Sequence, residues 1–145
     1  MAKVYIASDH AGFKAKEELK KFLQDEKSEI WVEDLGTNSE DSVDYPDYAK
    51  KLAQKVVKEK NSFGILICGT GIGMSIAANK VKGIRAALCH NEFTAKMSRN
   101  HNDANVLCMG ARILGIEEMK KIANAFLNER FEFGRHENRV KKVEC

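Results

Sequence analysis

The sequence lacks the features that mark membrane, secreted and zinc-dependent proteins. No apolar run approaches the ~20 residues that a membrane-spanning helix needs, and the start MAKVYIASDHAG lacks the long apolar stretch of a signal peptide. The cysteines lie far apart with no C-x-x-C pair, so neither a zinc site nor a disulfide framework is indicated; they are Cys68, Cys89, Cys108 and Cys145. We therefore expect a cytoplasmic protein without a metal ion or a membrane contact.

The sequence also lacks a block of charge of one sign. Its 24 Lys and Arg are scattered among 21 Asp and Glu, which gives a net charge of +3 and no basic tail. This pattern argues against nucleic acid as a partner. A local basic cluster in the C-terminal stretch remains a candidate for a small anionic ligand; it consists of Arg130, Arg135, Arg139, Lys141 and Lys142.

Length and patterning predict one globular domain over residues 1–145. The chain is 43% hydrophobic and 31% charged, as in ordinary globular proteins. Short β-prone runs alternate with amphipathic helical patterns. The runs are 4–7, 30–32, 63–67, 84–88 and 105–109, and the helical patterns are 13–23, 48–57, 74–81, 92–99 and 116–127. This alternation predicts an α/β fold, a three-layer Rossmann-like sandwich with a five-stranded parallel sheet.

Two positions mark boundaries in this organisation. Pro46, the only proline, lies where the second helix should begin, a position that tolerates proline. From about Arg130 onward the chain is charged and poor in hydrophobic residues. We expect this C-terminal arm to be a short charged helix or an extended segment, which a partner subunit helps to hold.

Three polar loops are candidates for a ligand site, because open parallel sheets bind ligands outside the carboxyl ends of their strands. They span residues 8–12, 68–73 and 98–103. In the second loop, glycines at alternate positions let the backbone present N–H groups to an anion at a helix N-terminus. Met74 and Ser75 follow this loop. A Walker A loop would have Lys at 74 and Ser or Thr at 75, and a dinucleotide fingerprint would have glycine at 74. Nucleotide binding is therefore only a weak alternative.

Several side chains in these loops have both a chemical and a structural interpretation. Cys68 ends a strand beside the glycines and a helix dipole, which favour a thiolate that acts as a base or nucleophile. A small buried residue that closes the strand is about equally plausible. Asp9 could serve a ligand or cap the first helix, and His101 could serve a ligand or cap a helix end. No role is assigned to His90 or His136.

The arginines of the C-terminal arm have two interpretations as well. Arg135 and Arg139 are four residues apart, so on a helix they share one face and could clamp a phosphate. A solvated charged arm is favoured on the residues alone.

Six segments together carry a resemblance to a known family. They are IASDHAGF at 6–13, DYPDYA at 44–49, ILICGTGIGMSIAANK at 65–80, GIRAALC at 83–89, SRNHNDANVLCMGAR at 98–112 and GRHENR at 134–139. Over nearly its whole length the sequence resembles ribose-5-phosphate isomerase type B, whose family also contains the galactose-6-phosphate isomerase subunits.

The resemblance implies an aldose–ketose isomerase that interconverts D-ribose 5-phosphate and D-ribulose 5-phosphate through an enediolate, without a cofactor. Cys68 matches the base that removes the carbon-bound proton, and His101 matches the residue that opens the furanose ring, with Asn102 beside it. Thr70 could relay a proton between the sugar oxygens. The backbone of the glycine loop corresponds to the hole for the enediolate oxygen; the loop consists of Gly69, Thr70, Gly71, Ile72 and Gly73.

The resemblance also implies how the phosphosugar is held. Asp9 and His10 match substrate-binding positions, and Tyr45 matches the lining of the sugar pocket. The phosphate would be bound at three positions, which are Arg112, Arg135 and Arg139. The family builds each site across a subunit interface, so a homodimer or tetramer is expected.

The resemblance also bears on the branch of the family and on the range of substrates. One branch of the family has serine in place of the cysteine and a glutamate base where this sequence has Met74, so the chain belongs to the cysteine branch. Alternatives that stay open are an allose-6-phosphate isomerase, a galactose-6-phosphate isomerase subunit that needs a second chain, and a non-catalytic phosphosugar-binding module.

Overall fold

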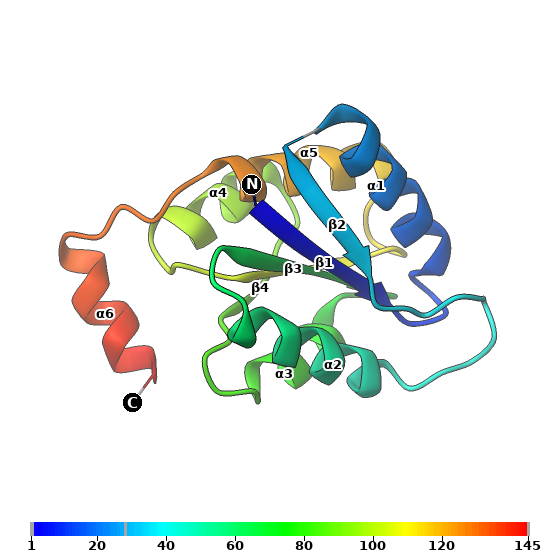
Figure 1. Ribbon diagram of the computed structural model, residues 1–145, viewed down its shortest axis with the longest axis horizontal. Helices are drawn as coiled ribbons and strands as arrows, with labels where there is room; N and C mark the ends of the chain where they lie inside the picture. Colours follow the sequence, from blue (N-terminus) through cyan, green and yellow to red (C-terminus); the bar gives the residue numbers. More distant parts are fainter. Residues whose placement is uncertain (1, 28, 145) are drawn as a thin grey trace.

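A single parallel sheet organises the chain in the computed structural model, which describes residues 2–27 and 29–144 (Figure 1). Its strands lie in the order β2-β1-β3-β5-β4, and every neighbouring pair is parallel. They are β1 (Ala2–Ser8), β2 (Ile30–Asp34), β3 (Ser62–Cys68), β4 (Ala86–Leu88) and β5 (Val106–Gly110). The predicted five-stranded parallel sheet is confirmed.

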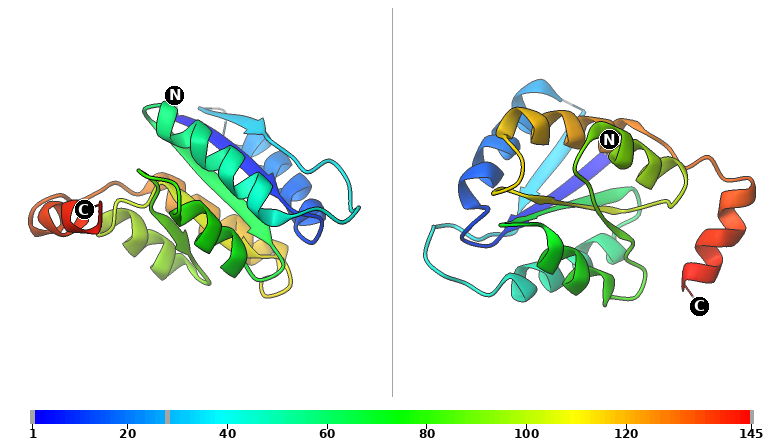
Figure 2. Two further views of the ribbon diagram at one scale, coloured as in Figure 1. Left: turned by 90° about the horizontal axis from the view of Figure 1, so that it is seen from below. Right: turned by 180° about the vertical axis from the view of Figure 1, so that it is seen from behind.

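Helices cover both faces of this sheet and give three layers, as predicted (Figures 1 and 2). One face carries α1 (Phe13–Glu26), α4 (Glu92–Asn100) and α5 (Ile116–Asn128), and the other carries α2 (Tyr45–Lys58) and α3 (Ile72–Asn79). The strand side chains explain the two cores. Val4 and Ile6 of β1 join the cluster on the α1 face, whereas Tyr5 and Ala7 join the cluster under α2. A strand apolar on both faces is typical of a doubly covered parallel sheet.

Two asparagine side chains shift the element bounds from those predicted. The side chain of Asn79 both donates to the Ala86 carbonyl and accepts from its N–H, so α3 ends there rather than at residue 81. Asn105 Oδ1 accepts from Arg85 N–H at 2.8 Å, so β4 begins at Ala86 rather than at residue 84. In both places a side chain takes a backbone partner that periodicity alone assigns to helix or strand.

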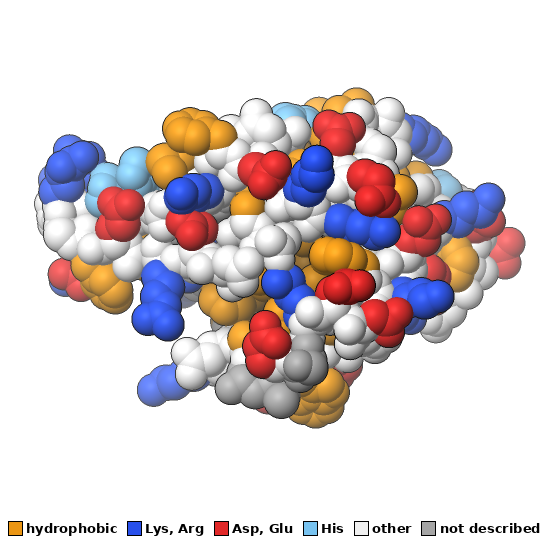
Figure 3. Space-filling model, turned by 90° about the horizontal axis from the view of Figure 1, so that it is seen from above, with side chains coloured by type: hydrophobic (Ala, Val, Ile, Leu, Met, Phe, Trp, Pro, Cys, Tyr) orange, Lys and Arg blue, Asp and Glu red, His pale blue; other side chains and the backbone are white. Residues whose placement is uncertain are grey.

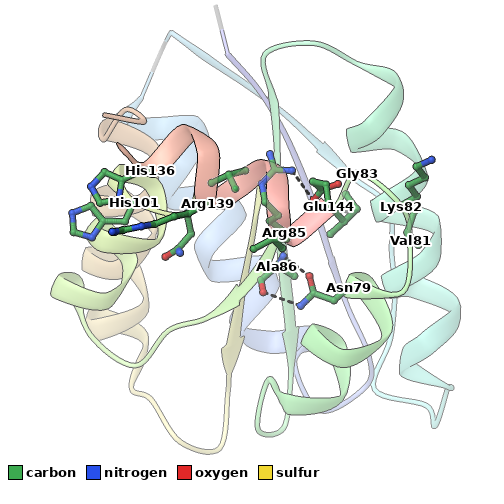
Figure 4. A pocket seen from close by; sticks show the side chains of 14 residues that line it. Asn79, Val81, Lys82, Gly83, Arg85, Ala86, His101, His136, Arg139 and Glu144 are labelled. Carbon is green, nitrogen blue, oxygen red and sulfur yellow. Dashed lines mark hydrogen bonds and ion pairs between the residues drawn. The ribbon is translucent and has the colours of Figure 1, made fainter. Parts of the chain in front are cut away.

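The last helix, α6 (Arg135–Glu144), projects away from the sheet beside α4 (Figures 1 and 2). Phe133 and Gly134 both have left-handed backbone angles (φ 62° and 56°), which turn the chain just before it. Arg85 Nη1 reaches Glu144 Oε1 at 3.1 Å across the space between α6 and the segment before β4. That space is a groove of about 710 Å³ (Figure 4).

The surface over α1, α4 and α5 mixes charges of both signs, with Lys and Arg side chains interspersed among Asp and Glu (Figure 3). Within residues 2–27 and 29–144, no helix is both long and apolar enough to cross a membrane.

Candidate active site

The glycine loop brings the sulfur of Cys68 to the N-terminus of α3. Strand β3 ends at Cys68, Gly71 adopts a left-handed conformation (φ 82°), and α3 starts at the next residue. The N–H of Gly71 points back to Cys68 Sγ at 3.1 Å, and Cys68 is only 5% exposed. The Cys68 side chain is thus buried at the end of a strand, as expected for a small residue that closes the strand. It also accepts a backbone N–H at the positive end of a helix dipole, an environment that favours negative charge.

Close packing fixes the path of this loop. A Cβ on Gly71 would lie 2.6 Å from the Leu88 side chain and 2.9 Å from the carbonyl carbon of Met109. A Cβ on Gly73 would lie 2.5 Å from the ring of Tyr45, so that ring lies directly against the loop. Close approach therefore favours glycine at 71 and 73, and the left-handed backbone angle favours it at 71 as well.

Asp9 and His10 follow β1 at the same edge of the sheet. Asp9, 7% exposed, accepts the N–H of Gly12 at 3.1 Å and so closes the turn before α1, whose N-cap is Gly12 without a side-chain cap. His10 Nδ1 accepts the N–H of Val43 at 3.1 Å. Because Nδ1 is an acceptor here, neutral His10 carries its proton on Nε2 and can donate from that atom.

Arg112 places a positive charge beside the glycine loop from the end of β5. Its backbone N–H donates to the carbonyl of Gly69 at 2.9 Å, and its guanidinium lies 3.3 Å from where a Cβ on Gly69 would be. The carboxyl edge of the sheet thus gathers a buried sulfur, backbone donors, an imidazole and a guanidinium. This combination can hold an anion and move a proton.

His101 and Asn102 lie at the opposite edge of the sheet, and this corrects the expectation that the 98–103 loop stands at the carboxyl ends of the strands. The loop precedes β5 instead of following a strand. Val106 at the start of β5 pairs with Gly64, whereas Gly110 at its end pairs with Cys68, so roughly 13 Å of strand separates the two ends. His101, Asn102 and Arg139 instead line the groove beside α6 (Figure 4).

The chain matches the Ribose/Galactose Isomerase family over residues 4–143. Ribose-5-phosphate isomerase B of Escherichia coli is 46% identical over 143 residues, with 99% of this chain and 95% of that protein covered. This chain belongs to the ribose/galactose isomerase family.

Two solved structures share its fold. A ribose-5-phosphate isomerase B from Clostridium thermocellum is 48% identical with a TM-score of 0.94, over 98% of this chain and 95% of that one. A ribose 5-phosphate isomerase from Thermotoga maritima is 51% identical with a TM-score of 0.94, over 99% of this chain and 97% of that one.

The other described cysteines of this chain differ from Cys68 in their setting. Burial raises the pKa of Cys89, and it raises the pKa of Cys108 well above its usual value. Both therefore remain thiols at neutral pH. Cys145 lies outside the described residues. Of the described cysteines, only Cys68 belongs to the glycine loop.

Sequence reasoning missed two neighbours of His101. The His136 ring stacks on that of His101 (Figure 4), with centroids 4.2 Å apart and planes at 11°. Glu132 Oε1 lies 3.7 Å from Nε2 of both rings. His136 is 8% exposed, and burial, followed by the charge of His101, lowers its pKa. The two histidines are far apart in the sequence, so no local spacing could have paired them.

The same three side chains present ligand atoms within 4.8 Å of one another, the spacing of a possible metal site. Nearly parallel rings, however, direct their nitrogen lone pairs along parallel planes that do not converge on one point. The charges of Arg135 and Arg139 also act on this cluster. Stacked rings beside two guanidinium groups suit an anion better than a metal cation.

Proposed function

We propose that this chain is an aldose–ketose isomerase that interconverts D-ribose 5-phosphate and D-ribulose 5-phosphate through an enediolate, with Cys68 as the base. The observation that carries the proposal is the position of Cys68 Sγ, which lies in the glycine loop and receives the N–H of Gly71. Relatives named ribose-5-phosphate isomerase B support the choice of substrate.

In the proposed reaction, the Cys68 thiolate removes the proton from carbon 2 of the open-chain aldose. The electron pair moves to form the carbon 1–carbon 2 double bond and leaves negative charge on the carbonyl oxygen, which the backbone N–H groups of residues 69–73 stabilise. Return of a proton to carbon 1 gives the ketose. Thr70 Oγ1 accepts the N–H of Ile72 at 3.2 Å, so its own proton is free to pass between the two sugar oxygens.

A second copy of the chain completes the site in this proposal. His101 opens the furanose ring with Asn102 beside it, yet both lie at the edge of the sheet away from Cys68. A neighbouring subunit would bring its own copies to the carboxyl edge. Its Arg135 and Arg139 would hold the phosphate together with the first chain's Arg112, while substrate contacts in the first chain would come from Asp9, His10 and Tyr45. The working form is then a homodimer or tetramer.

The proposal further treats residues 1–145 as one isomerase domain that acts without a cofactor, with the C-terminal arm from about residue 130 held by the partner subunit. The buried free thiols of Cys68, Cys89 and Cys108 suit a reducing compartment such as the cytoplasm.

Isomerisation by the purified chain alone, in buffer with a metal chelator, tests the proposal. Ribose 5-phosphate should turn over, and allose 6-phosphate and galactose 6-phosphate measured beside it give the substrate range. Turnover of a six-carbon substrate alone would replace the assigned substrate. Phosphosugar binding without proton exchange into solvent would indicate a non-catalytic module.

Substitution of the base gives a sharper version of the test. Cys68→Ser should lower kcat by about 10²–10⁴-fold, the usual contribution of a general base, and leave phosphosugar binding in place. Cys89→Ala is the matched control, because this thiol lies outside the glycine loop. Near-normal turnover in Cys68→Ser would remove Cys68 from the mechanism.

Substitution of an arm arginine tests the phosphate contact. Arg139→Ala should raise KM for ribose 5-phosphate at least tenfold, because a charge-assisted hydrogen bond contributes about 1.5–3 kcal/mol. Arg130→Ala, an exposed arginine before α6, is the control. An unchanged KM in Arg139→Ala would return the arm to the solvated-surface interpretation.

A further inference from the structure

Two side chains without a role in the proposed reaction contact the imidazole of His101, one at a face of the ring and one at its edge. The ring of His136 covers one face at 4.2 Å (Figure 4). The carboxylate of Glu132 lies 3.7 Å from Nε2. His101 itself is 39% exposed at its side chain, whereas the side chain of His136 is 10% exposed. The buried ring therefore forms a platform for the exposed one.

Backbone contacts anchor this platform to the end of α4. Glu132 N–H donates to the carbonyl of Asn100, the residue before His101, at 3.0 Å, and Asn100 Nδ2 donates to the carbonyl of Arg130 at 2.7 Å. The N–H of His136 donates to the Phe133 carbonyl at 3.0 Å. The segment that leads into α6 is thus fixed to the same turn that carries His101, and the stack does not depend on the free end of the arm.

The surroundings of the stack disfavour a positive charge on His136. Burial, followed by the charges of His101 and Arg135, lowers the pKa of His136, and Arg139 acts in the same direction, while Glu132 opposes them. His136 therefore stays neutral near pH 7. A neutral ring beside His101 avoids placing two positive charges on stacked rings whose centroids lie 4.2 Å apart. Glu132 Oε1 lies 3.7 Å from Nε2 of His101 and places a carboxylate beside the ring that carries positive charge during proton transfer.

We propose that His136 and Glu132 are positioning residues for His101, holding its ring in one orientation and stabilising its transient charge while it opens the furanose. This inference rests on the proposed role of His101. Proton transfer requires the imidazole within hydrogen-bond reach of the ring oxygen in a defined orientation, and small misplacements of a reacting group cost up to about 10²-fold in rate. His136 and Glu132 act only through His101.

The open-chain ketose separates ring opening from the chemistry at carbon. Ribulose 5-phosphate cannot close a furanose ring, because its carbon 5 oxygen carries the phosphate. Exchange of its carbon 1 proton with deuterium from solvent therefore reports the Cys68 step alone. Isomerisation of ribose 5-phosphate, which is mostly cyclic in water, reports ring opening as well. A variant that damages only His101 positioning separates the two rates, and a variant that damages the fold lowers both.

The experiment compares His136→Ala, His136→Phe and Glu132→Gln with wild type in both assays. His136→Ala should slow ribose 5-phosphate isomerisation about tenfold and leave deuterium exchange into ribulose 5-phosphate unchanged. His136→Phe keeps a neutral flat ring under His101 and should recover most of the lost rate. Glu132→Gln should slow isomerisation alone, and Glu132 is more than half exposed, so the fold does not depend on it. Glu137→Gln, an exposed acid in α6, is the control.

Three results would overturn the inference. His136→Ala could match wild type on ribose 5-phosphate, both assays could fall together, or His136→Phe could be as slow as His136→Ala. Absence of both activities in the wild-type chain would instead refute the proposed function, so the two failures are distinguishable.

Discussion

Two inactive variants of this chain should restore activity to each other when they assemble together. Cys68 and His101 lie at opposite edges of one sheet, so a site that uses both must draw them from different chains. Cys68→Ser removes the proposed base from one kind of chain, and His101→Asn removes the proposed ring-opening residue from the other. A site that takes Cys68 from a His101→Asn chain and His101 from a Cys68→Ser chain contains both residues intact.

The recovered activity depends on the fraction of sites that contain both intact residues. In an equimolar random mixture, about half of the chains that supply Cys68 are intact there, and about half of their partners are intact at His101. About a quarter of the sites are therefore complete. The fraction is the same for a dimer and a tetramer, provided that each site is shared by two chains. Each variant alone should retain only about 10⁻² to 10⁻⁴ of the wild-type rate on ribose 5-phosphate.

The assay mixes the variants by co-expression, or by unfolding and refolding them together, and then measures ribose 5-phosphate isomerisation. Each variant refolded alone is the control, and a mixture of either variant with wild type confirms that chains exchange. A mixture that shows no more than the average of the two separate variants, although its chains exchange, would refute the shared site. In that case Cys68 and His101 would have to act from one chain, against the sheet register.

Two further changes test the fold around the site. Gly71→Ala should cost about 1–2 kcal/mol for the left-handed angle and more for the approach of its Cβ to Met109, lowering both Tm and kcat, whereas Gly115→Ala, with nothing nearer than 3.7 Å, should change neither greatly. Burial alone would raise the pKa of Asp34, but hydrogen bonds from Lys16 and another lysine of α1 lower it below 3.8. The resulting stability is present above the unfolded pKa and is lost as the pH falls through the lower folded pKa. Asp34→Asn should therefore lower the unfolding free energy in urea at pH 7 and flatten its loss in acid; parallel acid profiles for the two proteins would contradict this.

Local patterns were sufficient to predict the layers of the fold. Apolar runs such as Val4–Ala7 are buried on both sides of the sheet, and helical spacing alternates with them along the chain. The glycine loop could be located for a similar reason, because the left-handed angle at Gly71 and the tight approach to Met109 leave glycine as the residue that fits. Such requirements act over a few residues and are visible in the sequence.

Element ends and polar side chains were less predictable. Asn79 bonds to the backbone of Ala86, seven residues away, and Asn105 to that of Arg85, 20 residues away, and these bonds shorten an expected helix and strand. The carboxylate of Asp9 accepts the N–H of Gly12 in the turn before α1, a local bond that the sequence left open against a ligand role. The partner of Asn105, in contrast, depends on β4 and β5 becoming neighbours.

By itself, the sequence determined the alternation of strands and helices, the loop that holds Cys68 and, through its motifs, the family. Only the tertiary structure decided that His101 lies at the other edge of the sheet and that His136 stacks on it. The physical reason is that parallel strands separate the loops before them from the loops after them by the length of the sheet. Which distant side chains then meet depends on strand order and on the turn before α6, and no local spacing encodes either.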